Sequence, residues 1–412
     1  MPRYVSLGQL PRQRHIQFRK PDGGLYAEQL FGTRGFSGPM SLMYHINLPT
    51  EVKSWEDRGP CKPEFLADEP LRHRHLRTKG MTPIGDAVTG RVCLLGNSDV
   101  YWHQALVGEQ MTYFYKNADA DECLFIHDGE GELQSMFGTV HFRPGDYLVI
   151  PKGIIFRLQF NTLPVRMIVI ESFTPIEIPR RYRNEVGQLL EHAPFQERDI
   201  RPPSELVTVD KREDTLVLIK ARERYTMYTY PYHPFDIVGW DGYEFPYAFS
   251  IHDFSPITGK LHMPPPIHQT FEAHNFVICT FAPRMLDYHP QSIKVPYNHS
   301  NLDSDEVLYY VEGNFGSRKG IEVGSLTLHP QGIPHGPHPG TIEASLAATH
   351  TAELAVMCDT FRPLFPTKAA LQMDDTKYPA SWEGEHFPGL ASGKMHLNGV
   401  TVPPASAAAF PK

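Results

Sequence analysis

One spacing of glutamate, glycine and proline occurs twice along this chain. In both copies a glutamate is followed seven residues later by glycine, and further on by Gly-x5-Pro-x-Gly-x2 ending in a ring-bearing residue. The first copy uses Glu122, Gly129, Gly145, Pro151, Gly153 and Phe156, and the second uses Glu306, Gly313, Gly324, Pro330, Gly332 and His335. Matching internal spacing in two places indicates a duplicated unit. Each copy describes a strand that ends in a turn, followed by a Pro-x-Gly turn that leads onto a neighbouring strand.

The segments around both copies are short, alternating or apolar, and separated by turn residues, which predicts strands rather than long helices. The 412 residues include 38 prolines and 32 glycines, and we expect one short helix, at residues 369–375. The chain is therefore expected to be mainly β, with two β domains. The expected division is an irregular N-terminal arm at 1–80, domains at 81–200 and 201–375, and an irregular tail at 376–412.

Each copy of the repeat resembles the paired motifs of the cupin superfamily, whose members are small jelly-roll β-barrels. In that family the first motif supplies histidine and glutamate to a metal, and the second motif supplies another histidine. The first copy has Tyr115, Asn117 and Phe156 where histidines would be expected. The resemblance thus implies two cupin barrels, with an N-terminal barrel that is degenerate and kept for packing, without a metal.

Composition narrows the function classes. The formal net charge is −8, so no basic surface for nucleic acid is expected. The start of the chain has no apolar stretch of signal-peptide length, and no run reaches the roughly 18 apolar residues of a membrane helix. Five scattered cysteines without a CxxC pair favour reduced thiols and a cytoplasmic location. Signatures of zinc proteases, serine hydrolases, P-loop and Rossmann proteins are missing.

Histidine is concentrated in one quarter of the chain. Ten of the 21 histidines lie between His252 and His350. Most are expected to be ordinary strand and surface residues, but histidine is also the commonest metal ligand and the usual acid–base group near neutral pH. A metal-binding or catalytic role is expected only for those histidines whose spacing matches that of a ligand set.

The second copy of the repeat keeps a set of metal ligands, His299, Glu306 and His335. Two imidazoles and one carboxylate on one face of a metal leave positions open for substrate and O₂, the arrangement of non-haem Fe(II) oxygenases. Zinc or manganese would accept the same ligands. Alternation along EVLYYV places Glu306, Leu308 and Tyr310 on one face.

Two other carboxylates compete with Glu306 for the ligand role. Asp303 and Asp305 lie beside it in SNLDSDEV. Alternation puts Asp305 on the opposite face of the strand, and the repeat spacing selects Glu306. We therefore expect Glu306 to be the ligand.

Five sequence motifs of this chain resemble those of the homogentisate 1,2-dioxygenase family. The motifs that carry the resemblance run in order along most of the chain: LYAEQL at 25–30, FDIVGWDGYEFPY at 235–247, LHMPPPIHQTF at 261–271, PYNHSNLDSDEVLYYVEG at 296–313 and GSLTLHPQGIPHGP at 324–337. The resemblance implies an Fe(II) enzyme that opens the ring of homogentisate with O₂ to give maleylacetoacetate, in aromatic amino-acid catabolism. It also implies a homo-trimer or hexamer.

The resemblance implies a role for each site residue. His299, Glu306 and His335 would hold iron, with His335 also at the substrate. His262 would be the acid–base histidine, with His268 six residues later as its rival, and Tyr297 and His329 would be pocket residues. The proline-rich segment after His262 would hold its imidazole still at low entropic cost.

This chain also departs from the family pattern. Six residues separate His299 from Glu306, one more than usual, so this loop must bulge, and Phe315 replaces a family tyrosine that can hydrogen-bond substrate. A gentisate-like or hydroquinone-type substrate is therefore the alternative in the same chemistry. A non-catalytic ligand-binding bicupin is the alternative of another class. The groups that hold a substrate carboxylate stay open, with Arg284 and Lys294 as candidates.

Overall fold

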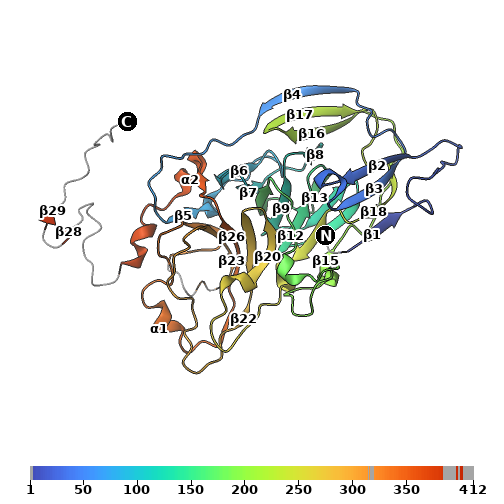
Figure 1. The fold of residues 1–412 in the computed structure, drawn as a ribbon. Coiled ribbons are helices and arrows are strands. Elements are labelled where there is room, and N and C mark those ends of the chain that lie inside the picture. The colour runs from blue at the N-terminus through green and yellow to red at the C-terminus, as the bar shows by residue number, and fades with distance from the viewer. Residues whose placement is uncertain (1–2, 314, 316–319, 384–395, 398–399, 402–412) are drawn as a thin grey trace.

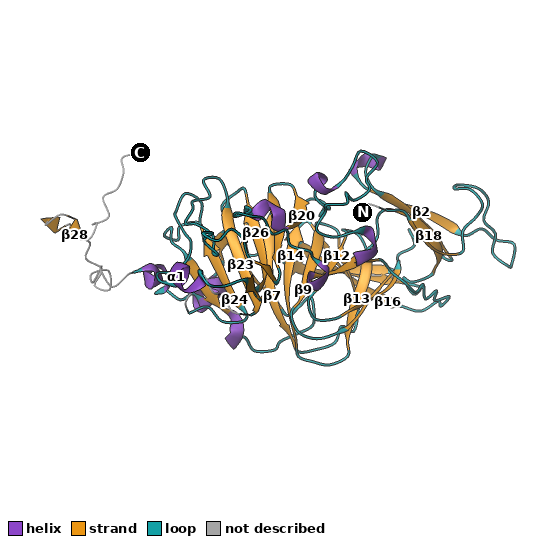
Figure 2. Cartoon of the chain, turned by 90° about the horizontal axis from the view of Figure 1, so that it is seen from below, coloured by secondary structure: helices purple, strands orange, loops and turns teal. Residues whose placement is uncertain are grey.

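The structure is a computed structural model of the whole chain. It describes residues 3–313, 315, 320–383, 396–397 and 400–401, the last four for their backbone alone. Most of the chain forms β-sheets, which lie side by side along the long direction of the molecule (Figures 1 and 2). Within these described residues no helix is long and apolar enough to cross a membrane.

The N-terminal half contains two large facing sheets that share one apolar core. The first has seven strands, in the order β11 (Gly138–Phe142), β10 (Gly131–Ser135), β13 (Ile155–Phe160), β8 (Phe114–Asn117), β16 (Thr215–Ala221), β17 (Arg224–Tyr230) and β4 (Ser54–Pro60). The second has eight, in the order β15 (Ile200–Arg201), β19 (Tyr247–Ser250), β12 (Asp146–Ile150), β9 (Asp121–Ile126), β14 (Val165–Ser172), β7 (Val100–Val107), β6 (Arg91–Gly96) and β27 (Phe365–Pro366).

The C-terminal half is built on a six-stranded sheet. Its order is β20 (Gln269–Ala273), β21 (Phe276–Phe281), β26 (Leu354–Thr360), β23 (Asp305–Glu312), β24 (Ser325–His329) and β5 (Arg74–Arg77). The remaining strand sets are smaller: β1 (Val5–Gly8), β18 (Ile237–Gly242), β3 (Met40–His45) and β2 (Ala27–Gly32) in one sheet, β22 (Arg284–Met285) with β25 (His350–Thr351), and β28 (His396–Leu397) with β29 (Val400–Thr401).

Helices are few and short. The two α-helices of the described residues are α1 (Thr341–Ser345) and α2 (Lys368–Met373). The latter confirms the helix expected at 369–375. The 3₁₀ turns are η1 (Arg34–Phe36), η2 (Thr78–Gly80), η3 (Arg180–Tyr182), η4 (Glu197–Asp199), η5 (Ile251–Asp253), η6 (Pro265–His268) and η7 (Tyr378–Trp382). The predicted class, mainly β with two jelly-roll cupin barrels, is confirmed.

The repeated Pro-x-Gly turns have the same geometry in both halves. Gly153 and Gly332 adopt φ of +87° and +75°, a left-handed backbone that favours glycine. Their amide groups donate to the carbonyls of Asn117 (2.6 Å) and Asn301 (2.7 Å). The shared spacing thus reflects one turn used twice.

Strand β23 belongs to two cores at once. Val307, Tyr309 and Val311 pack into the large core shared with the N-terminal half. Leu308 and Tyr310 face the interior of the C-terminal barrel, in a small cluster with Phe315. This alternation confirms the predicted face, and it explains why β23 is buried on both sides.

Two stretches expected to be irregular are ordered. Residues 1–80 contain five strands, β1 to β5. Of these, β1, β3, β4 and β5 pair with strands far away in the sequence, which local patterns cannot reveal, and β2 pairs with β3. Strands β16 to β19, expected in the second domain, pair with strands of the N-terminal half. In the expected tail, η7 packs against the C-terminal barrel, and Tyr378 is 3% exposed. Most of the predicted tail beyond residue 383 lies outside the described residues.

Candidate metal centre

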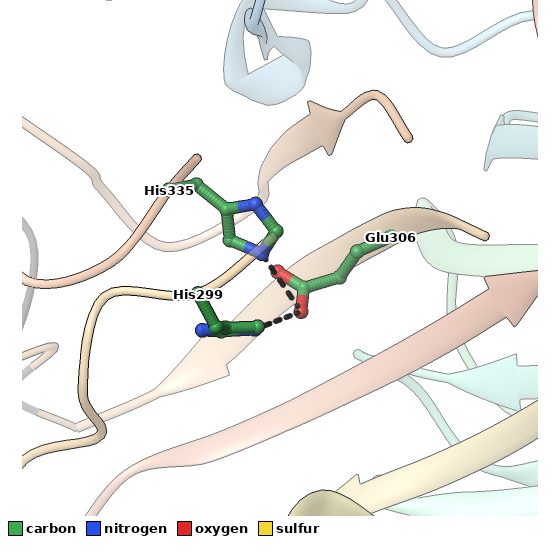
Figure 3. A group of neighbouring side chains, drawn as sticks. All are labelled: His299, Glu306 and His335. Carbon is green, nitrogen blue, oxygen red and sulfur yellow. Dashed lines mark ion pairs between the residues drawn. The ribbon is translucent and has the colours of Figure 1, made fainter. Parts of the chain in front are cut away.

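Three predicted ligands come together in the C-terminal barrel. One ligand atom each of His299, Glu306 and His335 lies within 4.8 Å of the others. Figure 3 shows both imidazoles turned towards the Glu306 carboxylate. The Nε2 atoms of His299 and His335 lie 4.0 Å and 3.5 Å from Glu306 Oε2. The part of the chain between residues 3 and 383 that the structure describes holds no second such group.

Backbone pairing fixes the two imidazoles. His299 and His335 face each other in an isolated antiparallel bridge, with reciprocal N–H···O bonds of 2.9 Å. His335 directly follows the Pro-x-Gly turn. His299 precedes the loop to β23, in which Leu302 is 80% exposed. The turn and the bridge therefore place both rings beside the start of β23.

Each imidazole presents Nε2 to the centre. Nδ1 of His299 lies 3.1 Å from the Tyr297 carbonyl, and Nδ1 of His335 lies 3.3 Å from the Ile333 carbonyl. Because a carbonyl can only accept, Nδ1 carries the proton in both rings, and Nε2 keeps its lone pair. Such contacts to the second nitrogen are how proteins orient metal-binding histidines.

His329 holds the third ligand from behind. Its Nδ1 donates to Glu306 Oε1 at 2.7 Å, and its Nε2 lies 3.0 Å from the Tyr378 hydroxyl. Burial raises the pKa of Glu306, but the hydrogen bond from His329 and the nearby His335 ring outweigh it, so the pKa lies well below its usual range. The carboxylate is thereby kept ionised, the form that binds a cation.

The residues fit a divalent metal. Nε2 of His335 is buried and makes no hydrogen bond, which is costly for a polar atom unless something else binds it. Two imidazole lone pairs and an ionised carboxylate suit iron, zinc or manganese, and their grouping on one side leaves room for further ligands.

A cavity of roughly 920 Å³ opens beside this centre. His299 and Glu306 line it, together with an apolar wall that includes Leu308, Phe315 and Met357. Phe315, the departure from the family pattern, is 7% exposed and packs edge-on against Tyr310 at 4.7 Å. A cavity of this size suits a small organic ligand.

The candidate acid–base histidines both line the cavity. His262 lies 5.0 Å, ring to ring, from Tyr297, and burial lowers its pKa. His268 is 2% exposed, and burial followed by the charge of Arg284 lowers its pKa to about 3. His262 Nε2 and His268 Nδ1 are both buried without a hydrogen-bond partner. Both histidines are therefore placed to exchange a proton with a ligand in the cavity.

Of the remaining predicted residues, one lines the cavity and the others lie outside it. Tyr297 lines the cavity and is 58% exposed. His329, expected in the pocket, lies behind Glu306 with a fully buried side chain. Asp305 faces away from the centre, where its carboxylate accepts the amide N–H groups of Gln331 (2.8 Å) and Leu364 (2.7 Å). Asp303 is exposed in the loop.

Some neighbours of the centre were not predicted. Asp359 pairs with Glu306 across β26 and β23 and lines the cavity, and burial followed by the charge of Glu306 raises its pKa to about 8. The rings of Tyr378 and Trp382 surround His329, which also contacts His73. Only Asp359 had a usable signal, since it is the second-to-last residue of β26 as Glu171 is of β14 in the first copy.

The N-terminal barrel repeats this plan with other side chains. Tyr115 pairs with Phe156 as His299 pairs with His335, and Glu122 pairs with Glu171 as Glu306 pairs with Asp359. The equivalent site therefore exists, but two of its imidazoles are replaced by a phenol and a phenyl ring.

Protein cations occupy the neighbourhood of these carboxylates. Arg91 donates to both oxygens of Glu122, at 2.7 and 2.8 Å, and Lys220 donates to Glu171. Asn117 donates to both carboxylates, at 2.9 and 2.7 Å. Buried carboxylates need such compensation, which in this barrel comes from side chains.

Comparison with known proteins gives matches along most of the chain. The family model described as homogentisate 1,2-dioxygenase N-terminal matches residues 5–251, and the C-terminal model matches residues 256–387. The "Putative dioxygenase" of Saccharolobus solfataricus is 42% identical over 383 residues, covering 92% of this chain and 98% of its own.

More distant relatives carry a substrate in their names. The homogentisate 1,2-dioxygenase of Rhodopseudomonas palustris is 27% identical over 76% of this chain and 75% of its own, and that of Oryza sativa is 26% identical over 87% and 82%. Among solved structures, a cupin 2 conserved barrel protein from Leptotrichia buccalis is 9% identical, covers 71% of this chain and 99% of its own, and has a TM-score of 0.34. Matches to both family models across most of the chain show that it is an oxygenase-type enzyme and belongs to the homogentisate 1,2-dioxygenase family.

Proposed function

We propose that this protein is an Fe(II)-dependent dioxygenase that opens the ring of homogentisate, inserting both atoms of O₂ to give maleylacetoacetate. The observation that carries this proposal is the cluster of His299, Glu306 and His335 beside a cavity of small-molecule size, whose wall includes His299 and Glu306. A bicupin that only stores or carries ligands has no need for such a preorganised set of three donors.

His299 Nε2, His335 Nε2 and the Glu306 carboxylate would hold the iron. When bound, Fe(II) would activate O₂ for reaction with an aromatic ring. His329 keeps Glu306 oriented through the 2.7 Å bond to Oε1, so that Oε2 faces the two imidazoles. The other residues then have to bind the ring, handle its protons and exclude water.

His262 would take the proton of a substrate hydroxyl at Nε2. This atom is buried without a partner, while Nδ1 lies 4.0 Å from the Asp287 carboxylate. Because burial lowers its pKa, the imidazole is neutral at pH 7 and ready to accept a proton. General-base help of this kind contributes about 10²–10⁴ in rate.

The apolar wall would hold the ring and keep water away. Leu308, Phe315 and Met357 present no hydrogen-bonding group to the ring, so hydroxyl recognition falls to the histidine side of the cavity. Phe315 is where substrate preference within the family could differ. The homogentisate and gentisate rings bear the same two hydroxyls and differ in the acidic arm.

The test is oxygen uptake by iron-loaded protein with homogentisate, gentisate and hydroquinone in turn. We expect the fastest uptake with homogentisate, one O₂ for each ring opened. Glu306→Gln should lose both iron and uptake, whereas its matched control Asp305→Asn should keep the iron. Fast uptake with gentisate and none with homogentisate would overturn the substrate, and failure to hold about one iron per chain would overturn the dioxygenase itself.

A further inference from the structure

Arg284 lines the cavity and has no ion-pair partner among the described residues. It begins β22, next to the centre, and is half-buried. Within residues 3–383 as the structure describes them, its guanidinium makes no hydrogen bond and no ion pair. A guanidinium offers five donors, and in this half-buried position they are available to an anion supplied by a ligand.

The other cation of the wall is already engaged. Lys294 donates to the carbonyl of Asp287 at 2.6 Å and to the hydroxyl of Ser292 at 2.7 Å, which fixes it in its own loop. The charges of Glu353 and Asp287 act on Arg284, but neither carboxylate lies within ion-pair distance, and burial lowers the pKa of the guanidinium. Arg284 is therefore the cation that remains available to a ligand.

Arg284 lines the same cavity as both candidate acid–base histidines. Burial is the main cause that lowers the pKa of His262 and of His268, and the charge of Arg284 adds to it. The ring of His262 lies 5.0 Å from that of Tyr297, which lies 6.2 Å from that of His299. A ligand that satisfied these groups together would have a hydroxyl near His299, a flat apolar body and an acidic arm at Arg284.

We propose that Arg284 binds the carboxylate of an aromatic acid and so selects acidic over neutral hydroquinones at this site. The inference rests on the proposed function, because it places the acid in the cavity where ring opening would occur. A guanidinium pairs with a carboxylate through two parallel N–H···O bonds, so it would fix the direction of the arm as well as its charge.

The experiment has a kinetic arm and a binding arm. In the first, kcat/KM is measured for homogentisate and for its neutral methyl ester in the iron-loaded protein. In the second, phenylacetate and neutral phenylacetamide are titrated into the same protein under nitrogen by calorimetry. Both arms are run on the unaltered chain, Arg284→Gln, Arg284→Lys and the control Arg224→Gln. Arg224 is exposed, lies on β17 and pairs with Asp57.

The acid should be preferred in both arms, and Arg284→Gln should reduce that preference about 10- to 100-fold, the loss expected for a hydrogen bond to a charged group. Arg284→Lys should keep part of it, and Arg224→Gln all of it. An unchanged preference in Arg284→Gln, or an equal loss in Arg224→Gln, would overturn the inference. If no ring is opened at all, the proposed function fails, and the phenylacetate titration alone decides the role of Arg284.

Discussion

His262 and His268 line the same cavity, six residues apart, and each has one buried ring nitrogen without a hydrogen-bond partner. They differ in their surroundings. His262 contacts Tyr297, two residues before the proposed ligand His299, whereas His268 stacks obliquely on Phe281 at 4.7 Å and is almost fully buried. A proton acceptor has to reach the substrate, which favours the more accessible His262.

We therefore predict that His262→Asn keeps iron but lowers kcat by about 10²–10⁴, the usual contribution of a general base. His268→Asn, the matched control, should lose less kcat and more stability, since its side chain is buried in the barrel wall. Steady-state oxygen uptake and thermal unfolding of both variants are the measurements. Equal losses of kcat would remove the distinction between the two histidines.

For single residues, the sequence predicted which side of a strand each side chain occupies, because this follows from strand alternation. Period two separated Glu306 from Asp305, and the structure shows the two carboxylates on opposite faces. It did not predict Tyr378 or the position of His329, because contacts between residues 49 apart in the chain leave no local pattern. Asp359 was also missed, although its pairing with Glu306 repeats that of Glu171 with Glu122 in the first barrel.

At the scale of elements, the two barrels share the same strand pairing but have different side chains in their interiors. The repeated spacing predicted this duplication, because a left-handed turn requires glycine at the same position in each copy. It also predicted that the first barrel lacks the ligand histidines. What replaced them could not be predicted, since Arg91 and Lys220 reach Glu122 and Glu171 from strands that carry no motif.

The cluster in the first barrel leads to a stability prediction. Lys220 is 4% exposed, so Lys220→Met leaves the charge of Glu171 buried with only its neutral partners, which should cost about 3–5 kcal/mol of unfolding free energy. Lys53→Met, which breaks the exposed pair with Asp214, should change it by less than about 1 kcal/mol.

Urea unfolding of both variants measures the difference. A loss for Lys220→Met no greater than that for Lys53→Met would contradict the structural role of the cluster. Iron content gives a second readout, because the substitution lies in the barrel without the ligand set and should leave metal binding at the other barrel intact.

At the scale of the whole molecule, the two halves are joined by exchanged strands. β5, from the N-terminal region, pairs with β24 at the edge of the C-terminal sheet, and β27 returns to pair with β6. The carboxylate of Asp374, 1% exposed, accepts hydrogen bonds of 2.6 Å from both Arg72 and Arg74. The expectation of an irregular N-terminal arm missed this exchange, because a four-residue strand is recognisable only beside its partner.

This exchange predicts that the C-terminal half does not fold alone. A fragment starting at residue 252 lacks β5 and leaves the edge of β24 open, and it buries Asp374 without its arginines. We expect no cooperative thermal transition from it, and recovery when residues 1–251 are co-expressed. A sharp transition from the isolated fragment would show that the exchanged strand is dispensable.

The proposed iron site lies in one barrel of the pair, at His299, Glu306 and His335. Anomalous diffraction at the iron edge, from crystals loaded with Fe(II) under nitrogen, tests it without relying on activity. We predict one peak per chain, beside both Nε2 atoms and the Glu306 carboxylate, and its loss in Glu306→Gln. A peak at Glu122 and Glu171, or none in the C-terminal barrel, would contradict it.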